Sequence, residues 1–227
     1  MIQAGTVPRP AESSDSSHNI GKRIESVYDA PYAHNYRLSD EAEIVTENHR
    51  HYRAILETIC SSLNSGARAL DLGCGTGRYF HCLRKIDRLV GVDISWEMLR
   101  QARHPVRGDQ IEIHRIDLVR SNLLELAFHA ESFDFIYSIG ALGEHSPFDL
   151  TLCENLYRPL KWGGKLFFTV VDRESRVCRK RLRRRVADAL YPVFPAAVRR
   201  RLDERWRSFY MTESELKAVM NNSPFPR

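Results

Sequence analysis

The sequence of 227 residues has no apolar run that approaches 18 residues, the length of about one membrane span. Its first 20 residues lack the apolar core of a signal peptide and include Glu12 and Asp15, so they indicate neither a secretory signal nor a transit peptide. The five cysteines are scattered, with no C-x-x-C pair, which argues against a disulfide scaffold and against a zinc site. We therefore expect no metal and a reducing, cytoplasmic location.

Positive charge is concentrated in one part of the chain. The formal net charge is +5, yet residues 173–207 contain 13 Lys and Arg against 4 Asp and Glu, so the remainder is net negative. Four interpretations of this basic segment stay open: a solvated face, contact with an anionic small molecule that carries phosphate or carboxylate, peripheral contact of residues 176–207 with an anionic membrane, or nucleic-acid binding. Nucleic acid is unlikely as a partner, because no aromatic side chains that could stack on bases are interleaved with the arginines.

Apolar runs alternate with helical patterns in the middle of the chain. The helical patterns cover residues 77–85, 96–103 and 150–160. Such alternation is typical of βαβ units with right-handed crossovers, so we predict an α/β fold, a doubly wound, Rossmann-like, mostly parallel sheet with helices on both faces. The predicted strands are 67–72, 88–93, 111–116, 133–139 and 165–171.

Composition divides the chain into four predicted segments. The first is rich in Ser and Pro and is expected to be disordered, and the second carries tyrosines spaced by four, a helix broken at Pro31, and a longer helix that opens at Ser39. The third holds the strands, and the fourth is helical and basic. The predicted boundaries are a disordered tail at 1–20, an N-terminal helical lid at 21–64, a nucleoside-binding core at 65–172, and a basic helical acceptor lid at 173–227.

Residues 69–79 (ALDLGCGTGRY) are the most informative stretch. An apolar strand ends in Asp71, and three glycines follow at alternate positions, Gly73, Gly75 and Gly77. Glycine reaches backbone angles closed to other residues and lets a ligand lie against the main chain, although a plain tight turn is the alternative. Asp93, 20 residues after Gly73 at the end of the second predicted strand, is placed to accept both hydroxyls of a ribose.

Asp71 distinguishes between nucleoside cofactors. A pyrophosphate on this loop would face a carboxylate and be repelled, whereas a cationic amino group would be attracted. S-adenosylmethionine has a ribose, an adenine, a sulfonium and an α-amino group, and no phosphate. We therefore predict S-adenosyl-L-methionine as the cofactor, and an NAD(P)-dependent oxidoreductase is the least favoured hypothesis.

Four segments resemble the motifs of class I S-adenosylmethionine-dependent methyltransferases of the small-molecule type. Residues 70–78 are similar to the first motif and residues 90–99 (VGVDISWEML) to the second. Residues 132–138 (SFDFIYS) resemble the fourth-strand motif, and residues 156–166 (LYRPLKWGGKL) resemble the turn into the fifth strand. The resemblance implies a Rossmann-like methyltransferase that uses S-adenosyl-L-methionine.

The resemblance also implies roles around the cofactor. It places Asp93 on the ribose, Ile94 and Trp96 near the adenine, and Asp117 against the adenine amino group. The cofactor-binding residues expected on this basis are Asp71, Gly73, Cys74, Gly75, Gly77, Asp93, Ile94, Trp96, Asp117, Leu118 and Ser138.

The sequence departs from the family in two respects. The family normally adds a strand pair after the last helix, but only seven residues follow Met220, so we expect this pair to be missing. No Asn-Pro-Pro-Tyr motif is present, which disfavours N-methylation of adenine or glutamine.

A general base, if the reaction uses one, is expected beyond the fourth strand, where Glu144 and His145 lie. His145 is the candidate because the pKa of an imidazole is about 6.5, with a pocket-lining role as the alternative. The predicted function is methyl transfer to an O or N atom of a small molecule, anionic or lipid-like. The alternative is a non-catalytic homologue that binds an adenosyl ligand or serves as a scaffold.

Overall fold

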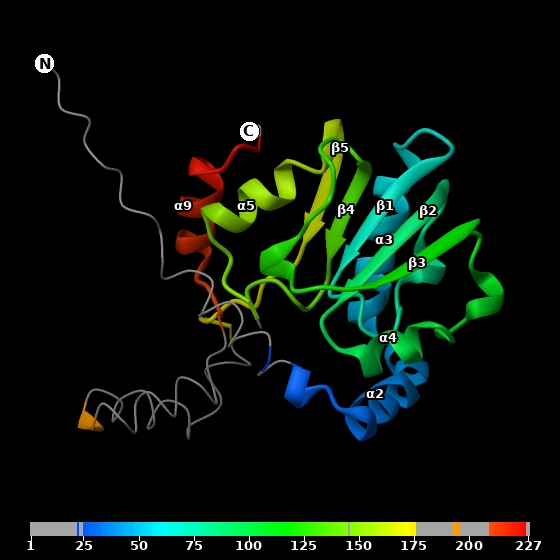
Figure 1. Ribbon diagram of the computed structural model, residues 1–227, viewed down its shortest axis with the longest axis horizontal. Helices are drawn as coiled ribbons and strands as arrows, with labels where there is room; N and C mark the ends of the chain where they lie inside the picture. The colour runs from blue at the N-terminus through cyan, green and yellow to red at the C-terminus, as the bar shows by residue number, and fades with distance from the viewer. Residues whose placement is uncertain (1–21, 23–24, 145, 176–192, 196–208, 226–227) are drawn as a thin grey trace, which may run out of the picture.

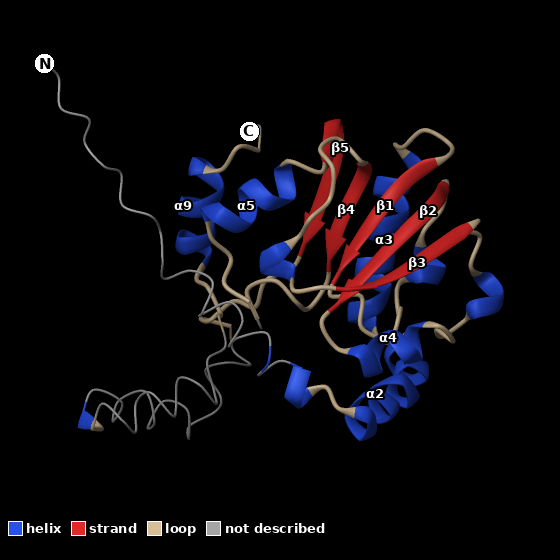
Figure 2. Ribbon diagram, viewed as in Figure 1, coloured by secondary structure: helices blue, strands red, loops and turns tan. Residues whose placement is uncertain are grey.

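The computed structural model describes residues 22, 25–144, 146–175, 193–195 and 209–225. Within them, the strands form one parallel sheet in the order β3-β2-β1-β4-β5 (Figures 1 and 2). The chain winds outward from β1 to β3 and then crosses to β4 on the other side of β1. The prediction of a doubly wound, Rossmann-like parallel sheet is confirmed. The strands are β1 (Ala67–Leu72), β2 (Ile86–Asp93), β3 (Arg115–Arg120), β4 (Phe133–Ser138) and β5 (Leu160–Phe168).

Helices cover both faces of the sheet because successive residues of a strand point to opposite sides. Ala69 belongs to a buried cluster with Leu56 of α3 and Leu99 of α4. Its neighbour Leu70 belongs to a second cluster with Leu152 of α5, against which α9 also packs. The helix α2 packs against α4 beyond the carboxyl ends of the strands (Figure 1). The helices are α2 (Ala30–Glu43), α3 (Glu47–Ser61), α4 (Trp96–Ala102), α5 (Leu150–Tyr157) and α9 (Glu213–Asn222).

The N-terminal helices begin and end at other residues than predicted. The helical stretch is broken near Pro31 as predicted: residues 28–29 are not helical, and Pro31 lies in the first turn of α2, where no intrahelical N–H bond is required. The side chain of Asp29 caps that turn and accepts a hydrogen bond from the backbone N–H of Tyr32 at 3.0 Å. The helix predicted to open at Ser39 is wrong: α2 runs through that position, and the break falls before Thr46, which caps α3.

The helix predicted at residues 77–85 is also wrong. Only a short 3-10 turn, η1 (Phe80–Cys82), forms there. Gly77 has a left-handed φ of 76°, and the ring of Phe80 packs so closely that a Cβ on Gly77 would lie 2.6 Å from it. All three residues of η1 are buried, so core packing holds the turn in place of a helical ladder.

The third strand lies four residues later than predicted. β3 covers Arg115–Arg120, and its last residue pairs with Asp93 at the end of β2. Ile111 and Ile113, which suggested the earlier strand, pack against the core from the preceding loop. This shift decides which residue reaches the edge of the sheet next to Asp93.

The chain after β5 is described only in part. No strand follows β5 within residues 169–175 and 209–225, where α9 begins with a capping box between Thr212 and Glu215. Most of the basic segment and the predicted N-terminal tail lie outside the described residues. None of the helices within the described ranges has both the length and the apolar character needed to cross a bilayer.

Candidate active site

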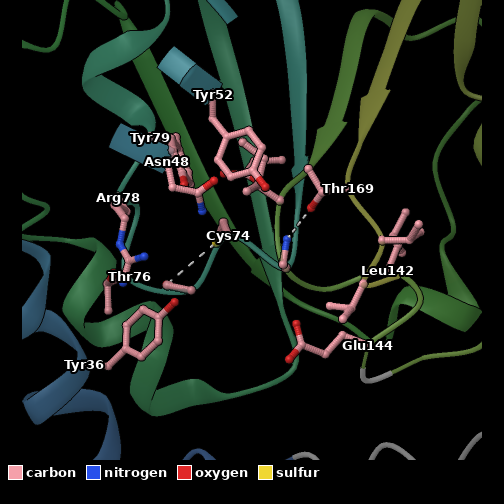
Figure 3. Close-up of a pocket in the computed structure, with 17 residues that line it drawn as sticks. Tyr36, Asn48, Tyr52, Cys74, Thr76, Arg78, Tyr79, Leu142, Glu144 and Thr169 are labelled. Carbon is pink, nitrogen blue, oxygen red and sulfur yellow. Dashed lines mark hydrogen bonds between the residues drawn. The ribbon is translucent and has the colours of Figure 1, made fainter. Parts of the chain in front are cut away.

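Two pockets meet at the carboxyl ends of β1, β2 and β4, where the order of the strands reverses and ligands of such sheets bind. The Asp93 pocket is lined by Asp93, Ile94, Met98, Asn122 and Leu123, among others. The Asp71 pocket is shown in Figure 3 and is lined by residues that include Asp71, Asn48, Tyr52, Arg78 and Glu144. The two pockets share Tyr36, Gly73, Gly75, Ile139 and Gly140.

The glycine loop lies at the junction of the two pockets. The backbone N–H groups of Gly73 and Cys74 both donate to the carbonyl of Val92, at 2.8 and 2.9 Å, and hold the loop on β2. Gly75 has a φ of 54°, and no atom lies within 4 Å of the place where its Cβ would be. A ligand can therefore approach the main chain at Gly75.

Asp93 ties the loop to α4 while facing its pocket. Its carboxylate accepts a hydrogen bond from the N–H of Gly75 and another from the N–H of Ser95, each at 2.9 Å. Burial raises the pKa of Asp93, and these backbone donors oppose the rise. A carboxylate has about four lone-pair sites, so Asp93 retains acceptors for the hydroxyls of a ligand.

Asp71 is almost fully buried in the floor of its pocket, with 4% of its surface exposed. It lies on β1 between Gly91 of β2 and Tyr137 of β4. Burial raises the pKa of Asp71 to about 8, although the adjacent hydroxyl of Tyr137 lowers it in part. A cationic group in this pocket would favour the ionised form of Asp71.

A buried polar cluster joins α2 to the glycine loop. Asp40 of α2 is fully buried and accepts hydrogen bonds from Thr76 Oγ1 at 2.6 Å and from Arg78 Nε at 2.5 Å. The guanidinium of Arg78 also lies 4.7 Å from the ring centroid of Tyr36. Sequence reasoning missed this cluster, because it assigned Asp40 only to the first turn of a helix. The sole signal was the polar pair Thr76 and Arg78 within the glycine motif.

Aromatic and acidic side chains surround the Asp71 pocket. In Figure 3, Tyr36 and Arg78 lie on one side of it, and Glu144 lies on the other. Burial raises the pKa of the Glu144 carboxyl. Burial also raises the pKa of Tyr36, while Arg78 lowers it in part. The described wall of this pocket therefore carries two carboxyl groups, from Asp71 and Glu144.

The structure brings together part of the predicted set of cofactor residues. Gly73 and Gly75 line both pockets, Asp71 and Cys74 line one, and Asp93 and Ile94 line the other. Five predicted residues line neither pocket: Gly77, Trp96, Asp117, Leu118 and Ser138. The predicted base His145 lies outside the described residues.

The expectation that Asp117 contacts the cofactor disagrees with its position. It lies in the middle of β3, where Arg88 Nε and Arg115 Nε donate to its carboxylate at 2.7 and 2.9 Å. It lines neither pocket, because the true end of the strand is Arg120. Asn122, which sequence reasoning did not select, reaches the Asp93 pocket instead.

Ser138 and Trp96 lie at the ends of the strand and helix that border the pockets. The Ser138 hydroxyl donates to the carbonyl of Leu72 at 2.8 Å and thereby joins β4 to β1. Trp96 opens α4, and 49% of its surface is exposed.

The sheet, its switch point and an acid at the end of β2 define a Rossmann-like protein with a nucleoside site. Residues 69–164 match the family model described as a methyltransferase domain. The matched segment contains the glycine loop and Asp93, and it ends within β5, before Thr169 and Val170 of the Asp71 pocket. This match covers 96 of the 227 residues and agrees with the resemblance of the motifs to the class I S-adenosylmethionine-dependent methyltransferases, which use S-adenosyl-L-methionine as cofactor.

Known relatives agree with this assignment. A demethylmenaquinone methyltransferase from Oceanobacillus iheyensis is 28% identical over 163 residues, which are 70% of this chain and 63% of the relative. The chain thus spans less than two thirds of that protein. A crystal structure of a SAM-dependent methyltransferase from Thermotoga maritima has a TM-score of 0.57 at 20% identity. The match covers 90% of this chain and 82% of the Thermotoga chain.

A third relative was solved with the cofactor bound. The phosphoethanolamine N-methyltransferase 2 of Haemonchus contortus in complex with S-adenosyl-L-methionine has a TM-score of 0.54 at 19% identity. The match covers 77% of this chain and 36% of that one. At this level of identity the likeness concerns the fold.

Proposed function

We propose that the protein transfers a methyl group from S-adenosyl-L-methionine to a small-molecule acceptor bound in the Asp71 pocket. The observation that carries this proposal is the junction of the two pockets at Gly73, Gly75 and Gly140. A nucleoside in the Asp93 pocket would extend across the open face of Gly75 toward Asp71 and Glu144. The sulfonium of the cofactor supplies the methyl group at that junction.

The residues of the two pockets fit the cofactor group by group. Asp93 would hold the ribose hydroxyls, and Ile94 and Met98 offer apolar contact to the adenine. Asn122, with both donor and acceptor atoms, would meet the polar edge of the base in place of Asp117. Asp71 would attract the α-amino group, and Arg78 lies in the same pocket for the carboxylate.

Alignment of the acceptor atom with the methyl–sulfur bond contributes much of the rate enhancement of such a transfer. An acceptor bound in line with the sulfonium reacts in an effectively intramolecular step. The acceptor would enter between Tyr36 and Glu144. We propose that Glu144 takes a proton from the acceptor or anchors it, because its raised pKa lies nearer to neutral pH than that of a solvated carboxylate. The role suggested for His145 stays a prediction.

The described walls of the Asp71 pocket favour a neutral or cationic acceptor. Arg78 is the one cationic side chain in that lining, and Asp40 already pairs with it. With Arg78 engaged by Asp40 and by the carboxylate of the cofactor, Asp71 and Glu144 would repel a phosphate or carboxylate on the acceptor. The anionic or lipid-like acceptor inferred from the sequence therefore depends on the basic segment, which lies outside the described residues. The demethylmenaquinone methyltransferase relative adds support for a small-molecule acceptor in general.

Calorimetry followed by a turnover assay tests the proposal. We expect S-adenosylmethionine and S-adenosylhomocysteine to bind with one site per chain, and NAD not to bind. Release of S-adenosylhomocysteine in the presence of a panel of amines, phenols and quinols would identify the acceptor. Failure to bind either adenosyl ligand would overturn the proposal, and binding without turnover on any acceptor would favour the non-catalytic alternative.

A conservative variant then tests Glu144. E144Q should retain the dissociation constant for S-adenosylmethionine and lose about 10²–10⁴-fold in kcat, the usual contribution of a general base. The matched control is E154Q on the outer surface of α5. Equal kcat values for E144Q and the wild-type protein would exclude Glu144 as the base.

A further inference from the structure

Three side chains that can ligate a metal converge in the core between α3 and η1. The ligand atoms of His49, His81 and Cys82 all lie within 4.8 Å of one another. Cys82 Sγ is 3.5 Å from His81 Nε2 and 3.9 Å from His49 Nε2. The exposed fractions of these side chains are between 0% and 3%, so solvent does not separate them.

We propose that His49, His81 and Cys82 bind one thiophilic d¹⁰ metal ion. The distances agree with this chemistry. Metal–nitrogen bonds of about 2.0 Å and metal–sulfur bonds of about 2.3 Å place a ligating nitrogen and sulfur about 3.6–3.8 Å apart around a tetrahedral or trigonal ion. The two observed separations lie on either side of that range, so the cluster could close on an ion with small side-chain shifts.

The rings are held in place by stacking. The imidazoles of His49 and His81 are nearly parallel, with centroids 5.5 Å apart and 10° between their planes. The ring of Tyr79 also stacks on His49, at 4.9 Å and 9°. His81 and Cys82 are consecutive residues of η1, and their ligand atoms nevertheless lie 3.5 Å apart.

If the three side chains only fill the core, some of their buried polar atoms have no hydrogen-bond partner. Nδ1 of His49 and Nδ1 of His81 are buried without a hydrogen-bond partner in the part of the chain that the structure describes. Buried polar groups without partners are rare in folded proteins and call for an explanation. Coordination through both Nε2 atoms would place the proton of each ring on Nδ1 and leave that N–H group without a partner, so the case for an ion rests on the distances and not on these two atoms.

The neutral imidazoles suit coordination, whereas the thiol must lose its proton when it binds the metal ion. Burial lowers the pKa of each imidazole to about 4, so both are neutral at pH 7 and keep a free lone pair. Burial raises the pKa of the Cys82 thiol to about 12. Binding therefore breaks the S–H bond, forms the metal–sulfur bond and releases one proton to solvent.

The surrounding charge favours an ion of low charge. Arg53, Arg84 and Arg107 add positive potential at His81 and Cys82, and Glu57, which pairs with Arg53 at 2.7 Å, offsets part of it. A univalent ion with the Cys82 thiolate would leave no net charge in the core, whereas a divalent ion would leave one positive charge. Three soft or borderline ligands in a closed site fit Cu⁺, and Zn²⁺ would take a fourth ligand as well.

An ion here would fix α3 to the segment that follows the glycine loop. Tyr79 lines the Asp71 pocket and stacks on His49, so the metal would stiffen one wall of that pocket. Sequence reasoning had no means to find this cluster, since His49 and Cys82 are 33 residues apart and belong to no metal-ligand motif.

The experiment titrates the full-length protein under anaerobic conditions with Cu⁺ buffered by a chromophoric chelator, and separately with Zn²⁺. We expect one ion per chain from at least one of the two metals, a rise in the melting temperature on binding, and thiolate-to-metal absorption when Co²⁺ replaces Zn²⁺. C82S should weaken binding at least tenfold and remove that absorption.

A second buried cysteine provides the matched control. Cys153 lies on α5 in the opposite core cluster, and C153S should leave metal uptake unchanged. H49Q serves as an independent variant, and circular dichroism confirms the folding of each. Uptake by the wild-type protein that is no greater than that of folded C82S or H49Q, or equal loss in C153S, would overturn the proposal.

Discussion

Arg78 of the glycine loop donates from Nε to the fully buried carboxylate of Asp40 on α2, at 2.5 Å. The two residues are 38 positions apart in the sequence. Through this pair and the bond from Thr76, the N-terminal helix is attached to the loop that borders both pockets. α2 is therefore a structural support of the cofactor site, in addition to any role in covering it.

The first prediction concerns Asp40. D40N removes the charge that balances Arg78 and should lower the free energy of unfolding by about 3–5 kcal/mol, the usual cost of breaking a buried pair. The loosened loop should also weaken S-adenosylmethionine binding. Thermal unfolding and calorimetry measure the two effects.

The neighbour Glu41 is the control for D40N. It pairs with Arg37 on an exposed surface at 3.6 Å, so E41Q should change stability by less than about 0.5 kcal/mol. Equal stability of D40N and E41Q would contradict a structural role for the buried pair.

The second prediction separates the two roles of Asp93. D93N keeps an acceptor for backbone N–H groups but loses the charge, and D93A loses both. We expect roughly 10–100-fold weaker binding of S-adenosylmethionine for each, the loss of about one or two charged hydrogen bonds. D93A should in addition melt at a lower temperature, because Gly75 and Ser95 lose their partner. An unchanged dissociation constant in either folded variant would refute ribose binding by Asp93.

The third prediction concerns pH and Asp71. Because the pKa of Asp71 is about 8 in the ligand-free protein, its carboxyl group is mostly protonated at neutral pH. It must lose that proton to pair with a cationic amino group. The dissociation constant for S-adenosylmethionine should therefore fall as pH rises from about 6 to about 8. Above about pH 8 it should level off, because Asp71 is then already ionised in the ligand-free protein. D71N should bind more weakly and lose this pH dependence.

Stability should change with pH in the opposite sense. The pKa of Asp71 is higher in the folded chain than the value of about 3.9 expected in the unfolded chain. Its contribution to stability is thus fully present below about pH 4 and is lost as pH rises through about 8. D71N should lack this decline, whereas D117N, altered outside both pockets, should keep the wild-type pH profile of binding. Identical profiles for D71N and the wild-type protein would contradict the assignment.

The fourth prediction uses two glycines with left-handed backbones and open space at the Cβ position. Gly75 lies at the pockets, with a φ of 54°, and Gly66 lies before β1, with a φ of 83°. G75A and G66A should each cost about 1–2 kcal/mol in stability for the same backbone reason. Only G75A should weaken binding of S-adenosylmethionine, because its methyl group enters the space of the ligand. Comparable binding by both variants would show that no ligand lies against Gly75.

The strand and loop around the cofactor could be predicted from the sequence because their signals are local. The apolar run before Asp71 marks β1 at the bounds the structure has, and the alternate glycines mark the turn that follows it. Asp93 could be selected because a buried strand ends there whatever lies around it. These features depend on residues that are neighbours along the chain, where backbone preference and burial act together.

Register and long-range contact required the tertiary structure. The isoleucines before β3 have the spacing of a strand, but in the structure they are loop residues that pack on the core. Only the pairing of β3 with β2 shows that Asn122, and not Asp117, reaches the Asp93 pocket. The Phe80 ring against Gly77 replaced a helix with a turn.

The sequence by itself therefore determined the fold class, the resemblance to a methyltransferase family and the acids at the ends of β1 and β2, since each rests on a contiguous motif. Only the tertiary structure decided that Asp40 meets Arg78 and that His49 meets Cys82. Both contacts join segments more than 30 residues apart. The side chains involved have ordinary local roles, as helix surface or turn residues, until packing of the N-terminal helices buries them together.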